Sequence, residues 1–132
     1  MIRHIKPERV PAISWTWQEG RYWDLWMIVH ALTGAICGCV AVLLGLHPAY
    51  AYPLILIGLT AWEVGEMVLG IREELVNWIL DIVFGMLGFW LVYERVLPDA
   101  GFVGTLGVGA LLALFNGLFA FLGWKAYRKR GI

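Results

Sequence analysis

The chain has 132 residues, of which 61% are hydrophobic and 15% are charged, and its formal net charge is zero. A soluble domain is closer to about 45–50% apolar and about 25% charged, so a soluble fold of this length is excluded by the apolar surface that it would have to hide. The few basic residues flank apolar runs, which argues against nucleic-acid binding. The composition therefore predicts an all-α, polytopic membrane protein surrounded by lipid.

Residues 1–22 are expected to form an interfacial N-terminal segment. Basic residues and Pro11 come first, and Trp15 and Trp17 follow. Basic and aromatic side chains favour the headgroup zone of a bilayer. Either a short amphipathic helix or an irregular segment on the membrane surface fits this pattern. The segment lacks the apolar run of a signal peptide, so no cleavage is expected.

Four apolar runs follow, each about as long as the roughly 20 residues that a membrane-spanning helix needs. The predicted spans cover residues 23–46, 49–71, 75–97 and 102–124. The last residues, 125–132, form a basic tail. The short connections predict that sequential helices are antiparallel neighbours in a four-helix bundle. Small residues four apart, such as Gly34 with Gly38 and Ala61 with Gly65, would let two helices approach closely.

Lysine and arginine predict the orientation of the spans. These residues gather before the first span and after the last, whereas the connection between the first two spans has none. Cytoplasmic flanks carry an excess of such residues. Both termini are therefore expected in the cytoplasm, together with the second connection, which holds Arg72.

The polar residues inside the spans share one depth in this topology. With a helical rise of about 1.5 Å per residue, His30 lies about 10 Å inside the cytoplasmic boundary, Glu63 about 12 Å and Asp81 about 8 Å. The strongly polar residues of this cytoplasmic third are His30, Glu63, Glu66, Asn77, Asp81 and Asn116. Scattered chance substitutions would not be expected to share a single level.

Charged side chains are costly at such positions. On insertion scales a charge at mid-membrane costs about 2.5–3.5 kcal/mol, whereas one Leu, Ile, Phe or Val gains about 0.3–0.6 kcal/mol. Glu63 and Glu66 are three residues apart and share a helix face, and Asn77 and Asp81, four apart, share another. We expect these faces to point into the bundle, where the polar groups find partners.

Two functional interpretations fit the cluster. One is a metal site, because the imidazole of His30 with the carboxylates of Glu63, Glu66 and Asp81 suits a divalent zinc, manganese or iron ion. Four-helix carboxylate di-metal proteins use paired Glu-x-x-His motifs, which this chain lacks, so that class is disfavoured.

The other is acid/base catalysis by the same four residues on a lipid head group or a polar substrate from the cytoplasm. The candidate substrate-binding residues are then Asn77, Asn116 and Arg72. A pathway for protons or ions is disfavoured because no polar residues line the outer half. A purely structural alternative is a closed hydrogen-bond network, such as His30 with Glu63 or Asn116 with Asp81.

Several of these residues form a pattern that resembles the VanZ-like membrane proteins. The pattern consists of His30-x-x-x-Gly34, Trp62-Glu63-x-x-Glu66, Arg72 and Asp81-x-x-x-Gly85-x-x-Gly88. The resemblance covers residues 23–91. Two positions depart from the family. Gly85 stands where the family usually has Asn, and the usual Gln near the end of the second span is replaced by Glu66 or is absent.

The resemblance implies a bacterial inner membrane and a lipid-linked or cell-wall precursor as substrate. The family is linked to low-level resistance to the glycopeptide teicoplanin, and its molecular activity is not established, so no reaction is implied. The competing hypothesis is a small accessory subunit of a larger membrane complex, or a homo-oligomer, in which the polar cluster is structural. A haem protein is disfavoured because His30 is the only histidine inside a span.

Overall fold

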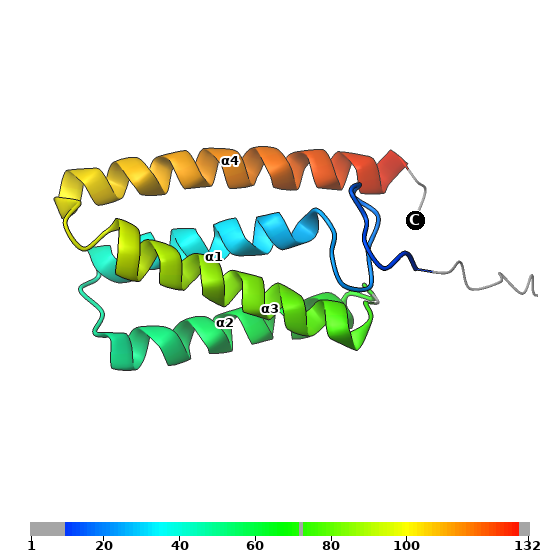
Figure 1. Cartoon of the computed structure of the whole chain (residues 1–132), viewed down its shortest axis with the longest axis horizontal. Coiled ribbons are helices and arrows are strands. Elements are labelled where there is room, and N and C mark those ends of the chain that lie inside the picture. Colours follow the sequence, from blue (N-terminus) through cyan, green and yellow to red (C-terminus); the bar gives the residue numbers. More distant parts are fainter. Residues whose placement is uncertain (1–9, 72, 130–132) are drawn as a thin grey trace, which may run out of the picture.

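The computed structural model describes residues 10–71 and 73–129, and the fold of this part is helical (Figure 1). The helices are α1 (Trp26–Leu43), α2 (Pro48–Val68), α3 (Leu75–Trp90) and α4 (Gly101–Lys129). A π-helical turn, Leu91–Val96, extends α3. All four helices, α3 with its extension, are long and apolar enough to cross a membrane. The prediction of an all-α, multi-pass membrane protein is confirmed.

The helix boundaries follow from local residue chemistry. Gly45 and Gly70 have positive φ angles of 61° and 87°, which suit glycine and end α1 and α2. His47 caps α2 by accepting a hydrogen bond from the Ala49 amide at 3.2 Å, and Pro48 occupies the first helical position, where it needs no N–H partner. Helix α4 continues past the predicted span into the basic residues, as far as Lys129.

One end of the bundle gathers His30, Glu63, Glu66, Asn77 and Asp81. This polar end consists of the start of α1, the end of α2, the start of α3 and the end of α4, and it lies on the right in Figure 1. The α1–α2 and α3–α4 connections lie at the opposite end. The up-and-down course of the chain therefore brings the α2–α3 connection to the end at which α1 begins and α4 finishes.

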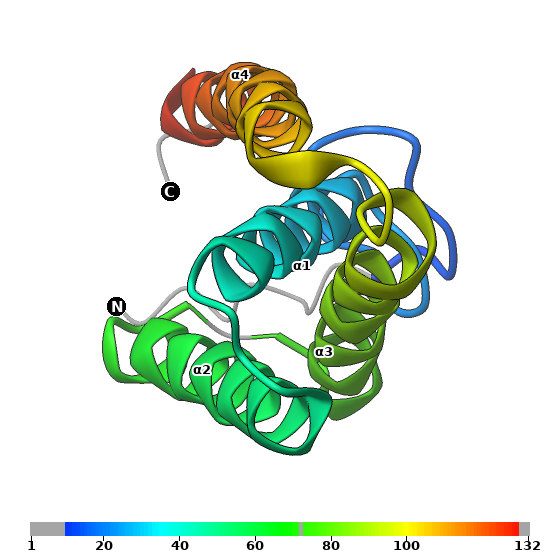
Figure 2. The same cartoon turned by 90° about the vertical axis from the view of Figure 1, so that its left-hand side faces the viewer.

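Helix α1 is the centre of the bundle, between α4 on one side and α2 and α3 on the other (Figure 2). Its closest partner is α3. A Cβ atom on Gly34 would lie 1.7 Å from the Gly85 carbonyl oxygen, and one on Gly88 would lie 1.9 Å from the Ala31 carbonyl oxygen. The two backbones touch because these positions lack side chains. The expected close approach through Gly34 is confirmed.

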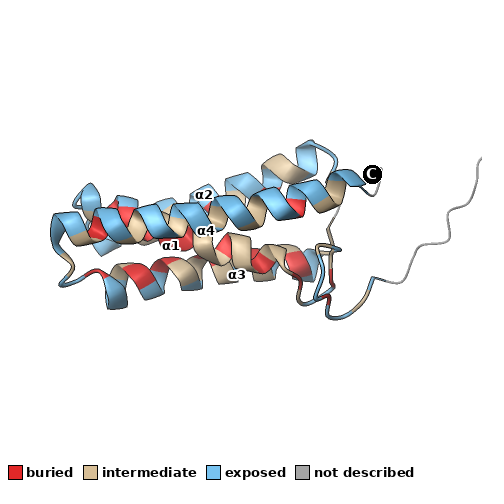
Figure 3. Cartoon of the chain, turned by 90° about the horizontal axis from the view of Figure 1, so that it is seen from above, coloured by how far each residue is buried: buried red, intermediate tan, exposed pale blue. Residues whose placement is uncertain are grey.

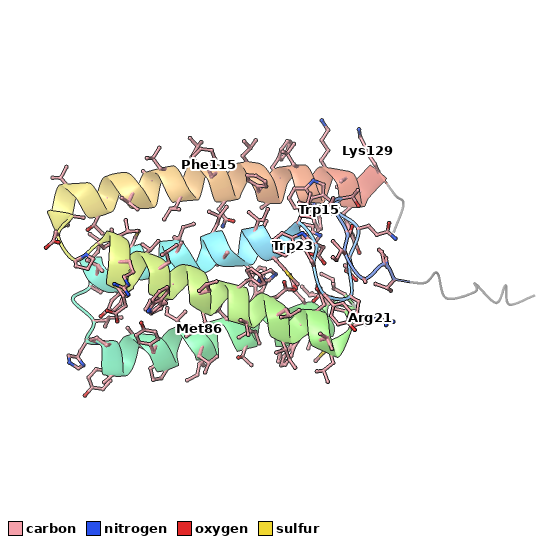
Figure 4. All side chains as sticks on the ribbon, in the orientation of Figure 1. Trp15, Arg21, Trp23, Met86, Phe115 and Lys129 are labelled. Atoms are coloured by element: carbon pink, nitrogen blue, oxygen red, sulfur yellow. The ribbon has the colours of Figure 1, made fainter. Side chains whose placement is uncertain are left out.

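Helix α4 packs against α1 alone among the described helices. The expectation that every pair of sequential helices would be neighbours is therefore wrong for α3 and α4. The reason lies in the composition of α4, which is apolar around most of its circumference and can face lipid. Figure 3 shows that most of α4 is exposed outside its contact with the bundle. Phe115, for example, points away from the bundle and is half exposed (Figure 4). Gly65 on α2 likewise has open space beside it, so it packs against no other helix here.

The described part of the N-terminal segment is an irregular loop that folds over the polar end. Backbone hydrogen bonds from Ser14 to Trp23 and from Arg21 to Pro11 close the loop on itself. Trp23 packs edge-to-face on Phe84 of α3. Trp17 packs on Trp26 and meets the backbone of α4 at Gly123, so this loop ties α4 to the rest of the polar end.

Candidate functional site

His30 lies between two carboxylates that come from different helices. Its Nδ1 atom is 3.4 Å from Oε1 of Glu63 on α2, and its Nε2 atom is 3.7 Å from Oδ2 of Asp81 on α3. All three side chains are buried. His30 is four residues into α1, Glu63 is five from the end of α2, and Asp81 is six into α3. The prediction that these residues share one level and meet inside the bundle is confirmed.

Glu66 stands one helical turn from Glu63 and extends the cluster toward the end of α2. Its Oε1 atom accepts a hydrogen bond from the indole nitrogen of Trp62 at 3.0 Å. A donor atom of His30, one of Glu63 and one of Glu66 lie within 4.8 Å of one another. Ligand atoms about 2.0–2.3 Å from a common ion lie roughly 3–4.5 Å apart, so this trio needs only a small contraction to hold a metal.

Several carboxylate oxygens of the cluster lack hydrogen-bond partners within the described part of the chain. They are Glu63 Oε2, Glu73 Oε2 and both oxygens of Asp81. Asp81 is fully buried and Glu63 is 1% exposed. Buried polar groups are normally satisfied, and an ionised carboxylate without a partner is among the most costly groups to bury. These oxygens therefore mark a position for a positively charged ligand.

Three acidic residues from outside the helices add to the negative charge. Burial and, after it, the charges of Glu19, Glu63 and other acids raise the pKa of Glu73, in the α2–α3 connection, to about 8. Burial likewise raises the pKa of Glu19 to about 7, with Asp24 and Glu66 adding to the effect. Each of these carboxyl groups holds its proton more tightly, first because it is removed from water and second because the surrounding charge is negative.

Asp24 is the best satisfied of these acids. Burial raises its pKa, whereas hydrogen bonds from backbone amides oppose the rise. Its Oδ1 accepts from the Trp26 amide at 2.9 Å and its Oδ2 from the Gly20 amide at 3.1 Å. Asp24 thus fixes the turn that leads from the N-terminal loop into α1. We assign it a structural role beside the cluster.

A cavity of about 190 Å³ adjoins the cluster. It lies between the end of α2 and the start of α3, and its lining includes Glu63, Glu66, Glu73, Leu75 and Trp78. The indole nitrogen of Trp78 is buried and has no acceptor among the described residues. The lining thus brings together several carboxylate-bearing residues and a tryptophan whose N–H has no acceptor among the described residues, which suits a small polar ligand or a metal-bound group.

The candidate substrate-binding residues have different positions. Asn77 is buried at the same end of the bundle, and its Oδ1 atom lacks a partner in the described structure. Asn116 donates a hydrogen bond to Thr33 Oγ1 at 3.1 Å and so joins α4 to α1. Because α4 contacts only α1, Asn116 does not pair with Asp81. Arg72 lies outside the described residues.

Glu19, Asp24 and Glu73 were not predicted from the sequence. All three lie in connecting segments, where acidic residues are usually solvated, and not inside the apolar spans. One signal was present: residues 73 and 74 are both acidic and follow directly on the α2 segment that carries Glu63 and Glu66. A residue near a helix end can reach back toward side chains one turn inside it.

The donor set defines what the cluster can do chemically. One imidazole and several carboxylates are ligands for manganese, iron or zinc ions. The only described side chain that pairs with these carboxylates is His30, which is charged only when it is protonated. Arg21 forms its ion pair with Glu74 at 2.8 Å on the exposed surface. Without a bound cation, the ionised carboxylates of the described residues would repel an anionic group.

Comparison of the chain with protein-family models, with curated proteins and with solved structures gave no match.

Proposed function

We propose that this multi-pass membrane protein binds a divalent cation at the polar end, through His30, Glu63, Glu66 and Asp81. The carrying observation is the pair of buried carboxylates on either side of His30, with Asp81 offering two oxygens that no described group satisfies. Metal coordination satisfies such oxygens and offsets their charge at once. In this proposal Glu66, held by Trp62, completes the ligand set from the accessible side.

The cation also explains how a polar head group would bind. Lipid-linked cell-wall precursors carry phosphate groups, which the carboxylates alone would repel. A bound divalent ion reverses the local charge and offers its open coordination positions to phosphate oxygens. The cavity beside Glu66 and Trp78 would receive the head group, with the Trp78 indole as a hydrogen-bond donor. If the protein is an enzyme, Glu63 or Asp81 would act as a general acid or base on such a ligand.

Metal analysis of the purified full chain tests the proposal. The protein in mild detergent is stripped with EDTA, dialysed against Mn²⁺ or Zn²⁺ and analysed by mass spectrometry for bound metal. We expect stoichiometric metal in the wild type and at least a tenfold loss of affinity in Glu63→Gln. Glu94→Gln is the matched control, because Glu94 lies at the other end of the bundle, hydrogen-bonded to Tyr52. Equal and negligible metal in all three proteins would refute the proposal.

We further propose that the chain is VanZ-like and acts in a bacterial inner membrane, with both termini in the cytoplasm. In support, three residues of the motifs that carry the resemblance, His30, Glu63 and Asp81, meet in space. The glycines of the same motifs, Gly34, Gly85 and Gly88, make the close contact between α1 and α3. Expression in a teicoplanin-sensitive bacterium tests this proposal. Reduced sensitivity with the wild type but not with Glu63→Gln would support it, and identical sensitivity would count against it.

A second candidate function is that of a small accessory subunit in a larger membrane complex. The observation in its favour is the one-sided packing of α4, on which Gly107 and Gly117 have open space beside them. Such positions would let a partner helix approach closely. Purification in a gentle detergent, with identification of any co-purifying chain, tests it. A homogeneous monomer would argue against this candidate.

A further inference from the structure

Glu73 joins the buried carboxylates from outside the helices. One oxygen from each of Glu63, Glu73 and Asp81 lies within 4.8 Å of the other two. This trio is distinct from the trio of His30, Glu63 and Glu66, and the two share only Glu63. Two sets of ligand atoms therefore stand side by side.

Glu63 is suited to belong to both sets. Its Oε1 atom faces Nδ1 of His30 at 3.4 Å, whereas its Oε2 atom is buried with no partner in the described part of the chain. Both carboxylate oxygens of Asp81 are likewise buried without a hydrogen-bond partner among the described residues. A carboxylate with two differently placed oxygens can bridge two metal ions, which in two-metal sites stand about 3.5–4 Å apart.

The charge of the region also calls for more than one cation. The carboxylates that gather at this end are Glu19, Asp24, Glu63, Glu66, Glu73 and Asp81. Arg21, in the N-terminal loop at this end, is engaged with Glu74 on the surface. One divalent ion offsets two ionised carboxylates and leaves Glu73 and Asp81 without compensation from any other described residue. A second ion at that position offsets two more.

We propose that the polar end holds two divalent cations bridged by Glu63. His30, Glu63 and Glu66 bind the first ion, and Glu63, Glu73 and Asp81 bind the second. This inference rests on the proposed function, the binding of a divalent cation. It adds a second site with Glu73 as its distinguishing ligand, and it assigns Asp81 to that second ion instead of to the single cation proposed above. The cavity next to Glu73 leaves coordination positions of the second ion open to water or to a ligand's oxygen atoms.

Manganese stoichiometry, combined with electron paramagnetic resonance, tests the inference on the detergent-purified full chain. We expect two Mn²⁺ per chain and the spectrum of an exchange-coupled pair. Glu73→Gln should bind one Mn²⁺, with the simple six-line signal of an isolated ion. Glu74→Gln is the matched control, since Glu74 is the neighbouring, exposed residue paired with Arg21, and it should bind two.

The outcomes separate this inference from the proposed function. One Mn²⁺ in the wild type would overturn the second site and leave the first standing, and no Mn²⁺ would overturn both. Two Mn²⁺ without exchange coupling would overturn the bridging role of Glu63. Two Mn²⁺ in Glu73→Gln would overturn the assignment of Glu73. A thermal melt of each variant shows that it is folded, so a loss of metal reports on ligation.

Discussion

The Nδ1 atom of His30 lies 3.4 Å from Oε1 of Glu63, and this contact joins α1 to α2 where the two helices otherwise touch little. The other ring nitrogen faces Asp81 on α3. One side chain therefore holds the polar ends of three helices in register. A charged cluster in this position constrains both the fold and any ligand, so its variants should affect stability and binding in opposite directions.

Asp81→Asn should make the metal-free protein more stable and weaken its metal binding. The wild-type carboxylate is fully buried with both oxygens unpartnered in the described structure, and the amide removes its charge. We expect a gain of about 1–3 kcal/mol at pH 8 in EDTA, because an uncompensated buried charge is strongly unfavourable. Thermal melts with and without Mn²⁺ measure both effects.

The control is Asp99→Asn, in the exposed α3–α4 connection, which should change neither quantity. A lower melting temperature for metal-free Asp81→Asn would show that the carboxylate has a stabilising partner already, and the cation would then be unnecessary.

Glu19 should make the metal-free protein less stable as the pH rises. Burial, with Asp24 and Glu66 nearby, raises its pKa from 4.5 to about 7, and Glu73 also faces it. Between these values the folded chain holds a proton that the unfolded chain releases, so the free energy of unfolding falls with increasing pH. In EDTA, Glu19→Gln should match the wild type near pH 4.5 and melt at a higher temperature at pH 8.

Glu74→Gln provides the comparison, because its carboxylate is on the surface and engages Arg21. It should keep the pH dependence of the wild type. If Glu19→Gln also keeps that dependence, Glu19 is solvated and does not belong to the acidic region.

The sequence predicted the membrane spans and the meeting of His30, Glu63 and Asp81 because both depend on simple lengths. An apolar run reveals a span, and a common number of residues from each boundary places side chains at one level. The positions of Glu73 and Asp24 could not be predicted in this way, since a connecting segment has no regular rise per residue. They lie near the cluster because the N-terminal loop and the α2–α3 connection fold back over the polar end.

The packing of α4 could not be predicted from the periodicity of its apolar residues. Its sequence is apolar on nearly every face, so no stripe of residues indicates which helix it contacts. Asn116 was predicted to join the cluster from its depth alone. Depth does not specify the side of the helix, and the side on which Asn116 lies directs it to Thr33 on α1. The lack of a Glu-x-x-His motif disfavoured the four-helix di-metal proteins, whose ligands all come from helices. The second ion that we propose has a ligand, Glu73, from the α2–α3 connection, and a helical motif cannot reveal such a ligand.

The orientation of the chain should follow its basic residues. Lys125, Arg128 and Lys129 lie at the polar end of α4, and cytoplasmic flanks are enriched in such residues. We expect a green fluorescent protein fused to the C-terminus to fluoresce in bacterial cells. Alkaline phosphatase inserted at Gly45, in the α1–α2 connection at the opposite end, should be active. The reverse pattern would place the polar end, and with it the cluster, on the outer side.

Gly34→Ala should separate α1 from α3 and so disturb the whole polar end. The new Cβ atom would lie 1.7 Å from the Gly85 carbonyl oxygen, and backbone cannot yield as a flexible side chain does. Forcing an extra methyl group into a closed contact costs about 1–3 kcal/mol or more, which a thermal melt in detergent detects. Gly107→Ala on α4 is the matched control, because nothing lies within 4 Å of its added methyl group.

Since the α1–α3 contact also sets the separation of His30 and Asp81, Gly34→Ala should bind Mn²⁺ more weakly than Gly107→Ala. A Gly34→Ala protein with wild-type stability and metal affinity would show that the two helices are not held in direct backbone contact.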